Sequence, residues 1–175
     1  MKKLIMLFSA IILMAGFSAK ITAQSTVNTS AGVVIITPIT LTQVTPLHFG
    51  VMSVLTATPG TCVLTTLGAR SATGGVNLSA QAPLFTNASY TVAGANSTTY
   101  ALTLPATITV TDGASHTMTI GTLLARFNLA GADAITSTLT AGGTDSFKVG
   151  GTLAVPMAQP AGTYTGTFAV TIAYN

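Results

Sequence analysis

The chain ends in an alternating run, Tyr164–Tyr174, which reads YTGTFAVTIAY and decides the fold class. Every second residue is apolar apart from one glycine, and threonine or alanine stands between, so an extended chain has one apolar and one polar face. The apolar face carries Tyr164, Gly166, Phe168, Val170, Ile172 and Tyr174. We predict a half-buried strand here. Its core-facing residues are Phe168, Val170 and Ile172, and its outward residues are Thr167, Ala169 and Thr171.

The rest of the chain beyond Gln24 repeats this pattern in short runs, in which 32 threonines alternate with branched and aromatic residues. The runs are Cys62/Leu64, Val76/Leu78, Tyr100/Leu102/Leu104, Ile108/Val110, His116/Met118/Ile120, Leu123/Ala125/Phe127/Leu129, Phe147/Val149 and Leu153/Val155. The turn signals between them are Pro59-Gly60, Gly74-Gly75, Asp112-Gly113, Gly142-Gly143, Gly150-Gly151 and Pro160-Ala161-Gly162. This spacing predicts a single antiparallel β-sandwich of immunoglobulin-like type over residues 31–175, without a helix longer than two turns.

The N-terminus has the pattern of a secretory signal peptide over residues 1–23. Lys2 and Lys3 precede the apolar stretch Leu4–Phe17, and small and polar residues follow. We expect cleavage after Ala23, or alternatively after Ala19, and export to the periplasm, the cell surface or the extracellular medium. A membrane span needs roughly twenty apolar residues, so we expect no transmembrane segment in the mature chain.

The residues after the leader divide into two parts. Residues 24–30 are polar and predict a flexible start. Val33, Val34, Ile35 and Ile36 then break the alternation, because four successive branched residues place apolar groups on both faces of a strand. Such a strand requires cover on both sides. We therefore expect this segment to join one subunit to the next.

The composition argues against a nucleic-acid binder. The chain is 49% hydrophobic and 5% charged. The charged residues after Lys20 are three cations, Arg70, Arg126 and Lys148, and three aspartates, Asp112, Asp133 and Asp145. A chain that is neutral after its leader has no basic stripe with which to neutralise phosphates, so we expect no nucleic-acid partner.

The titratable residues do not form a catalytic pattern. Acid–base catalysis needs groups that converge. Asp112, Ser115 and His116 are the closest set in sequence, but they straddle the Asp-Gly turn of a predicted hairpin, where aspartate usually serves the turn itself. We therefore expect no enzyme activity and no catalytic residue.

A metal or cofactor site is not predicted either. His48 has no second histidine or cysteine at ligand spacing, and Asp133 and Asp145 are not in an acid-rich calcium loop. Cys62 is the single cysteine, so it cannot form an intramolecular disulfide, and we interpret it as a small buried hydrophobe.

Four segments carry a resemblance to a known family: Pro46–Gly50, Gly68–Leu78 with Arg70 and Gly74-Gly75-Val76, Phe147–Leu153, and Gly162–Asn175. In this order they resemble a family of secreted bacterial proteins, the domain of unknown function family 4402. They are more distantly similar to the spore coat protein U domain and to chaperone–usher pilins. The resemblance implies a pilin-like sandwich with a fimbrial or coat-like structural role.

The likeness to pilins also implies a mode of assembly. Pilins end in an alternating strand with a glycine fourteenth from the end and a penultimate tyrosine, and Gly162 and Tyr174 occupy these places. In pilins a periplasmic chaperone holds the final strand and fills the groove left by a missing strand, until the next subunit's N-terminal extension replaces it. Self-association and a chaperone partner are thus implied. The chain lacks the paired cysteines usual in pilins, so a complete sandwich that needs no donor is the alternative.

Two function hypotheses follow. The first is a surface fibre or coat subunit that assembles by β-strand addition. The second is a monomeric adhesin or ligand-binding sandwich that uses loops at one end, which a groove lined with aromatic residues would favour. The candidate assembly residues are Val33, Val34, Ile35, Ile36, Gly162, Tyr164, Phe168, Val170, Ile172 and Tyr174.

Overall fold

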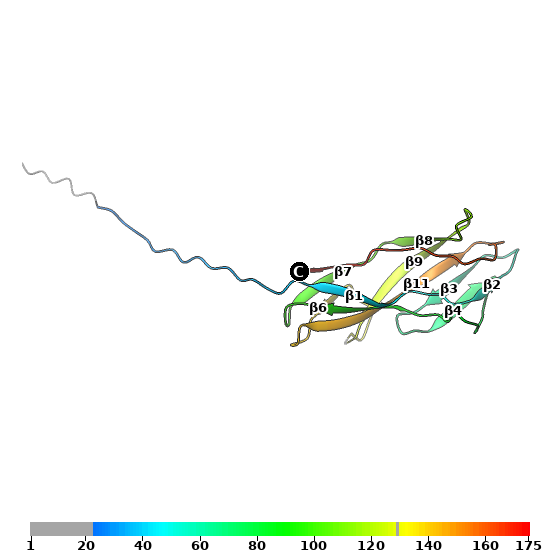
Figure 1. Ribbon diagram of the computed structural model, residues 1–175, viewed down its shortest axis with the longest axis horizontal. Coiled ribbons are helices and arrows are strands. Elements are labelled where there is room, and N and C mark those ends of the chain that lie inside the picture. Colours follow the sequence, from blue (N-terminus) through cyan, green and yellow to red (C-terminus); the bar gives the residue numbers. More distant parts are fainter. Residues whose placement is uncertain (1–22, 129) are drawn as a thin grey trace, which may run out of the picture. The chain divides into compact units, whose positions relative to one another are not determined.

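The computed structural model describes residues 23–128 and 130–175, and this part of the chain is all-β (Figure 1). The strands are β1 (Thr40–Thr45), β2 (Met52–Val54), β3 (Gly60–Leu64), β4 (Arg70–Gly74), β5 (Val76–Leu78), β6 (Ala88–Ala93), β7 (Thr99–Thr103), β8 (Thr107–Thr111), β9 (Thr117–Phe127), β10 (Thr136–Thr138), β11 (Thr144–Val155) and β12 (Thr171–Tyr174). The described residues contain no helix, and the predicted all-β class is confirmed. The described residues therefore contain no helix long and apolar enough to cross a membrane. The expected signal peptide lies outside the described residues, apart from Ala23.

A seven-stranded antiparallel sheet forms the body of the domain. Its order is β1-β6-β11-β3-β4, and β9 pairs with both β11 and β8. The long strand β11 organises this sheet, because it pairs with β6 over its first half, with β3 over its second half and with β9 along its other edge. A three-stranded sheet, β10-β7-β12, and a two-stranded sheet, β2-β5, complete the domain.

The three-stranded sheet faces the seven-stranded sheet across an aromatic core. Tyr100 on β7 meets Phe127 on β9 edge to face, with ring centroids 5.7 Å apart. Phe127 contacts Phe147 on β11, which in turn stacks on Tyr90 of β6 at 5.0 Å. Rings from both sheets therefore interlock, and pairs of this kind are worth about 1 kcal/mol each beyond the area they bury.

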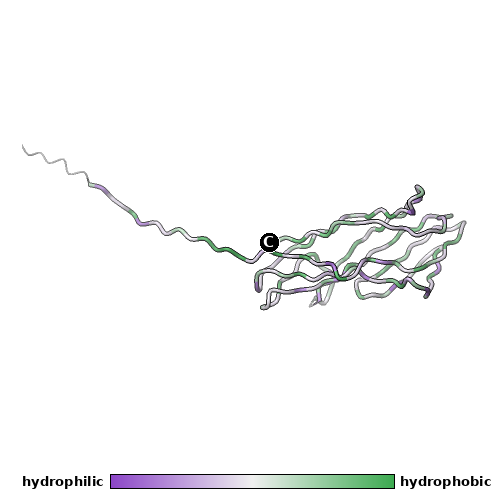
Figure 2. The backbone as a smooth tube through the Cα atoms, in the orientation of Figure 1, coloured by the Kyte–Doolittle hydropathy of each residue, from purple (hydrophilic) through white to green (hydrophobic). Residues whose placement is uncertain are grey.

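A second core cluster lies under β3, β8 and the far halves of β9 and β11. Its buried members are Phe49, Cys62, Leu64, Val76, Ile108, Val110, Met118, Ile120, Leu153 and Val155. Most are the alternating positions predicted from sequence, and the hydropathy colours alternate along these strands in Figure 2. His116 and Leu78 are exceptions, because both side chains are exposed.

The Gly150-Gly151 pair was predicted as a turn, and this prediction is wrong. Both glycines lie inside β11, which continues from Thr144 to Val155. A Cβ atom on Gly150 would lie 2.3 Å from the carbonyl oxygen of Leu64 and 2.9 Å from the Thr66 nitrogen. Gly150 is needed because the backbone of another segment passes against it where β11 changes partner from β6 to β3.

The C-terminal run is also less regular than predicted. Thr165 bridges Thr111, and ladder pairing resumes only at Thr171 opposite Thr103. The six steps from Thr165 to Thr171 therefore lie opposite eight steps from Thr103 to Thr111, which include the β7–β8 connection and β8. That connection contains Pro105, which has no backbone N–H to donate. The two extra residues and the proline interrupt the ladder, so residues 166–170 belong to no strand.

The described chain divides into two units, residues 23–35 and Ile36–Asn175. The domain unit thus begins at Ile36, five residues after the expected start at residue 31. In the first unit the described residues, 23–35, form no strand and are all exposed. The predicted strand at Val33–Ile36 is therefore not formed within this chain.

Candidate functional site

Three of the N-terminal candidate residues, Val33, Val34 and Ile35, are the most exposed large apolar side chains of the described chain, and Ile36 is about half exposed. The exposed fractions are 85% for Val33, 87% for Val34, 90% for Ile35 and 49% for Ile36. Figure 2 shows this apolar stretch in the N-terminal segment. Four adjacent branched residues without cover are unusual, because scattered apolar side chains are common on protein surfaces but continuous apolar runs mark contact sites.

The C-terminal candidate residues lie as the alternation predicts. Phe168 contacts both core clusters, and Val170 and Ile172 pack against the aromatic one. Their neighbours Thr167, Ala169 and Thr171 are exposed, so the predicted facing is confirmed. All three inward side chains are nevertheless only half-buried. The core is thus incompletely covered along this edge.

The backbone of the same edge is unpaired. In the described part of the chain, Gly166–Val170 lie outside every strand ladder and make no other backbone–backbone hydrogen bond. Nearer the start of the run, Gly162 is exposed in a loop and the half-buried Tyr164 donates its hydroxyl to the Pro160 carbonyl at 2.9 Å. The run therefore offers free backbone groups beside half-buried apolar side chains.

Tyr174 connects the two ends of the domain. Its hydroxyl oxygen accepts a hydrogen bond from the Ala95 N–H at 2.6 Å and donates one to the Thr37 carbonyl at 2.8 Å. A Cβ at Gly94 would lie 2.2 Å from this oxygen, so the glycine leaves room for the tyrosine hydroxyl. The penultimate tyrosine thus fixes the residue that directly follows Val33–Ile36.

Arg70 has a structural role that the sequence did not reveal. Its Nη1 donates to the carbonyl of Phe49 at 2.7 Å and to that of Val51 at 3.3 Å, and its Nη2 donates to Ser79 at 2.6 Å. The guanidinium also lies over the Phe85 ring, 4.7 Å from the centroid. Two of the segments that carry the family resemblance, Pro46–Gly50 and Gly68–Leu78, meet here. Arg70 holds backbone in place and is not free to bind a ligand.

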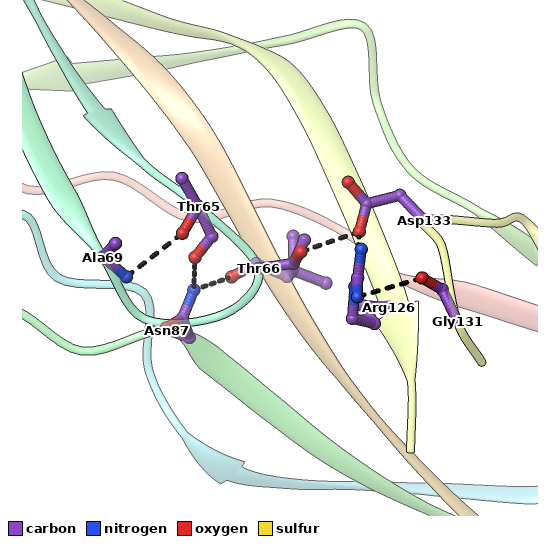
Figure 3. Close-up of polar contacts among 8 residues, drawn as sticks. Thr65, Thr66, Ala69, Asn87, Arg126, Gly131 and Asp133 are labelled. Atoms are coloured by element: carbon purple, nitrogen blue, oxygen red, sulfur yellow. Dashed lines mark hydrogen bonds and ion pairs between the residues drawn. The ribbon is translucent and has the colours of Figure 1, made fainter. Parts of the chain in front are cut away.

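A polar network forms beside the outer face of the seven-stranded sheet (Figure 3). Asp133 Oδ1 accepts hydrogen bonds from the Thr66 hydroxyl at 2.7 Å and from Arg126 Nε at 3.1 Å. Arg126 Nη1 also donates to the Gly131 carbonyl at 3.3 Å. The Thr66 hydroxyl, and then the Arg126 guanidinium, lower the pKa of the Asp133 carboxyl below its usual value.

The β3–β4 turn that carries Thr66 is itself fixed by hydrogen bonds. Asn87 Nδ2 donates to the carbonyl of Thr65 at 2.6 Å and to that of Val149 at 3.3 Å (Figure 3). The Thr65 hydroxyl accepts the Ala69 N–H at 3.1 Å. Asn87, which directly precedes β6, thus links the turn to β11, so Thr66 has a defined position above the sheet.

This network borders a groove of about 470 Å³. Its lining includes Val44, Thr66, Leu67, Ser89, Thr91, Arg126, Asn128, Ser146 and Lys148. The sequence predicted neither the groove nor its residues. One signal was present, because Arg126 and Lys148 both occupy the outward positions of alternating runs whose inward positions are core residues.

The residues considered for catalysis or metal binding are accounted for structurally. Asp112 lies in the β8–β9 hairpin turn, accepts the N–H groups of Ala114 and His116, and contacts His116 Nδ1 at 2.6 Å. This imidazole contact lowers the pKa of the Asp112 carboxyl. In the described residues no three histidine, cysteine, aspartate or glutamate side chains gather as metal ligands would.

Two buried titratable groups belong to the core. Cys62 is fully buried, which raises the pKa of its thiol, and the nearby Arg70 acts in the opposite direction. The interpretation of Cys62 as a buried hydrophobe is confirmed. Tyr100 donates to Asp145 Oδ2 at 2.9 Å, and burial followed by this carboxylate raises the tyrosine pKa. Ser137 donates to the same oxygen at 2.6 Å, so the carboxylate is well satisfied.

Comparison with known proteins places this domain in a family. The model of DUF4402, a domain of unknown function, matches residues 39–174, which begin one residue before β1 and end with β12. No curated protein matches the chain. Because the match covers the whole strand-bearing part of the chain, this protein belongs to the DUF4402 family.

Proposed function

We propose that this protein is a non-enzymatic, exported structural subunit of a surface fibre or coat, whose copies join by β-strand addition. The observation that carries the proposal is the exposure of Val33–Ile36, four branched apolar residues outside any strand. A strand that is apolar on both faces is stabilised when both faces are buried against other residues. A second copy of the domain provides that cover.

The acceptor is the C-terminal edge. Strand addition takes its affinity from backbone hydrogen bonds and its specificity from alternate side chains that enter pockets. The free backbone groups of Gly166–Val170 supply the first, and the half-buried Phe168, Val170 and Ile172 supply the second. Together these groups form an unfilled edge of the kind that a donor strand completes.

The same features support a chaperone partner during export. An exposed apolar run and an unpaired strand edge on one chain favour aggregation before the protein has assembled. A periplasmic protein that occupies the C-terminal edge until assembly would prevent this. Its contact surface would be the edge that later receives the donor segment.

The experiment compares two single substitutions in the N-terminal unit. Val34→Asp lies in the donor segment, and Val27→Asp makes the same change at a residue that is 83% exposed outside it. We expect the unaltered protein and Val27→Asp to form chains resistant to mild denaturant, and Val34→Asp to stay monomeric in size-exclusion chromatography. Chains formed equally by both variants would contradict strand donation.

Hydrogen exchange supplies a second test. Amides of residues 33–36 should exchange freely in a verified monomer and become protected in assembled chains, together with those of residues 166–170. A synthetic peptide of residues 31–37 should protect the same C-terminal amides in the monomer, whereas its Val34→Asp counterpart should not. Protection of residues 33–36 in a dilute monomer would reject donation and leave the monomeric binding module ahead.

A further inference from the structure

The groove beside the Arg126–Asp133 network lies on a sheet face whose backbone is already satisfied. Its floor consists of β6, β11 and the end of β9. In this region β6 and β11 each have a paired neighbour on both sides, whereas β9 pairs with β11 alone, since its pairing with β8 ends at Gly121. An extended peptide binds by adding to an unpaired edge, so the centre of the floor, formed by β6 and β11, cannot receive one in that way. Recognition in the groove has to come from side chains.

Two of the three cations that follow Lys20 face this groove. Lys148 on β11 stands directly opposite Arg126 on β9 in the strand register. Like charges directly opposite each other destabilise an antiparallel pair. The third cation, Arg70, is fully engaged with backbone carbonyls elsewhere. Although the chain has few charged residues, two of the same sign therefore lie side by side on one surface.

The local carboxylates satisfy only one of the two cations. Asp133 pairs with Arg126, whereas Lys148 is exposed and makes no hydrogen bond or ion pair with any described residue. Asp145 lies in the neighbouring hollow, where its oxygens accept from Tyr100, Ser137 and the Ser146 N–H. The groove thus keeps one net positive charge, at the Lys148 ammonium.

The remaining lining is rich in hydroxyl groups and has two apolar borders. Thr66, Ser89, Thr91 and Ser146 carry hydroxyls, and Asn128 adds an amide. Leu67, 72% exposed, and Val44, 61% exposed, lie at the groove as well. The rings of Tyr90, Phe127 and Phe147 are buried in the core, so they offer no stacking surface.

We propose that this groove binds an acidic glycan, with the carboxylate of one uronic-acid-type sugar held between Lys148 and Arg126. The hydroxyl and amide side chains match the sugar hydroxyls, because each can both donate and accept. Leu67 and Val44 cover the C–H face of the sugar. The volume of about 470 Å³ is within the usual range for small-ligand sites.

This binding is independent of strand addition, since neither Val33–Ile36 nor Gly166–Val170 lines the groove. Each copy in a fibre would then carry one weak site. Many weak sites on one polymer bind a repeating polysaccharide far more tightly than one copy does, through multivalency. The property therefore adds to the proposed structural role without depending on it.

The test is calorimetric titration of the purified protein, at low salt, with trigalacturonate and with a neutral galactose trisaccharide of the same length. We expect trigalacturonate to bind and the neutral sugar to bind at least tenfold more weakly. Lys148→Gln should weaken trigalacturonate binding about tenfold, and Lys148→Arg should restore most of it, because a cation is kept in place. Binding should also weaken as salt is raised.

A matched control separates the site from the overall charge. Thr117→Glu lowers the net charge by the same amount, nine residues away along β9, which is roughly 30 Å. It should leave trigalacturonate binding unchanged. Equal loss in Thr117→Glu and Lys148→Gln, equal affinity for the neutral sugar, or equal affinity for a triaspartate peptide would each overturn the assignment to an acidic glycan.

Discussion

Arg70 Nη1 lies 2.7 Å from the carbonyl oxygen of Phe49, and this bond joins two of the segments by which the family is recognised. A Cβ on Gly50 would lie 2.3 Å from the same nitrogen, so the glycine next to Phe49 leaves room for the guanidinium. His48 Nδ1 accepts the Gly50 N–H at 2.8 Å and fixes the turn. These motif residues are thus explained by packing around one arginine.

Replacing Arg70 by lysine should destabilise the domain by about 2 to 4 kcal/mol, because hydrogen bonds from charged groups are worth more than neutral ones. Lysine cannot reproduce the planar fork that reaches Phe49 and Ser79 from two different nitrogens. Urea unfolding monitored by circular dichroism measures the loss. Lys148→Gln, which removes an exposed cation without a partner, is the control and should change stability by less than about 0.5 kcal/mol.

Replacing Gly150 by alanine should also be costly. The added methyl meets the backbone of Leu64 and Thr66, which cannot rotate away as a side chain can. We expect a loss of about 1 to 3 kcal/mol, the usual range for overpacking.

Gly121 on the neighbouring strand β9 is the matched control for this substitution. A Cβ there would meet only the Thr107 Cγ2, at 4.0 Å. The free energy of unfolding of Gly121→Ala should therefore lie within about 0.5 kcal/mol of that of the unaltered protein. If both alanine variants are equally stable, the close approach at Gly150 is not as described.

Replacing Phe168 by alanine tests the C-terminal facing. Replacing a fully buried phenylalanine by alanine lowers the stability of the fold by about 3 to 5 kcal/mol. For the half-buried Phe168 the loss of stability should be about 2 to 3 kcal/mol. Thr167→Ala, on the exposed face, should be nearly neutral. Equal losses in thermal or urea unfolding of the two variants would mean that the two faces are exchanged.

The Asp133 carboxyl predicts a pH dependence. Its folded pKa is lowered by Thr66 and Arg126. A carboxyl of this kind stabilises the fold above its unfolded pKa and loses that contribution as the pH falls through the folded value. The stability difference between the unaltered protein and Asp133→Asn should be constant above about pH 5 and should shrink below about pH 4.

Asp112 does not disturb this comparison, although its pKa is lowered too. Its contribution is the same in both proteins and cancels in the difference. Unfolding curves at pH 6, 4 and 3 provide the measurement. A difference that is the same at all three pH values would rule out a stabilising role of the ionised Asp133.

Replacing Tyr174 by phenylalanine should cost about 1 to 2 kcal/mol, because two hydrogen bonds are lost and the Ala95 N–H loses its partner. Exchange of the Ala95 amide should quicken more than that of core amides. Tyr164→Phe is the control, since that hydroxyl bonds only to an exposed loop carbonyl. An Ala95 amide that exchanges at an unchanged rate would argue against the connection.

The fold class and the facing of the strands could be predicted from sequence, because period-two alternation depends on nothing but the geometry of an extended chain. Phe147, Val149, Leu153 and Val155 were placed correctly for this reason. Gly150-Gly151 was misread because the two uses of glycine, turning and close approach, look alike in a sequence. The difference lies in the backbone of Leu64, which is distant along the chain.

The groove was missed for a related reason. Arg126 and Lys148 are far apart in sequence, and only the register of β9 against β11 brings them together. In the sequence Arg70 could be recognised only as a positive charge, although its partners are backbone carbonyls. Every residue has a backbone carbonyl, so the sequence does not show which of them an arginine will contact. Side-chain periodicity can be read from a sequence, whereas strand register and backbone acceptors depend on tertiary structure.

The bond between Tyr174 and Thr37 has a mechanical consequence for a fibre built in the proposed way. Tension would enter each copy at Thr37, just after its donated segment, and leave through the C-terminal edge that holds the next copy. Because Tyr174 ends that edge and bonds to Thr37, load would pass between the two points through a short link. The aromatic core around Phe127 and Phe147 would carry little of it, so the domain could stay folded while the fibre is stretched.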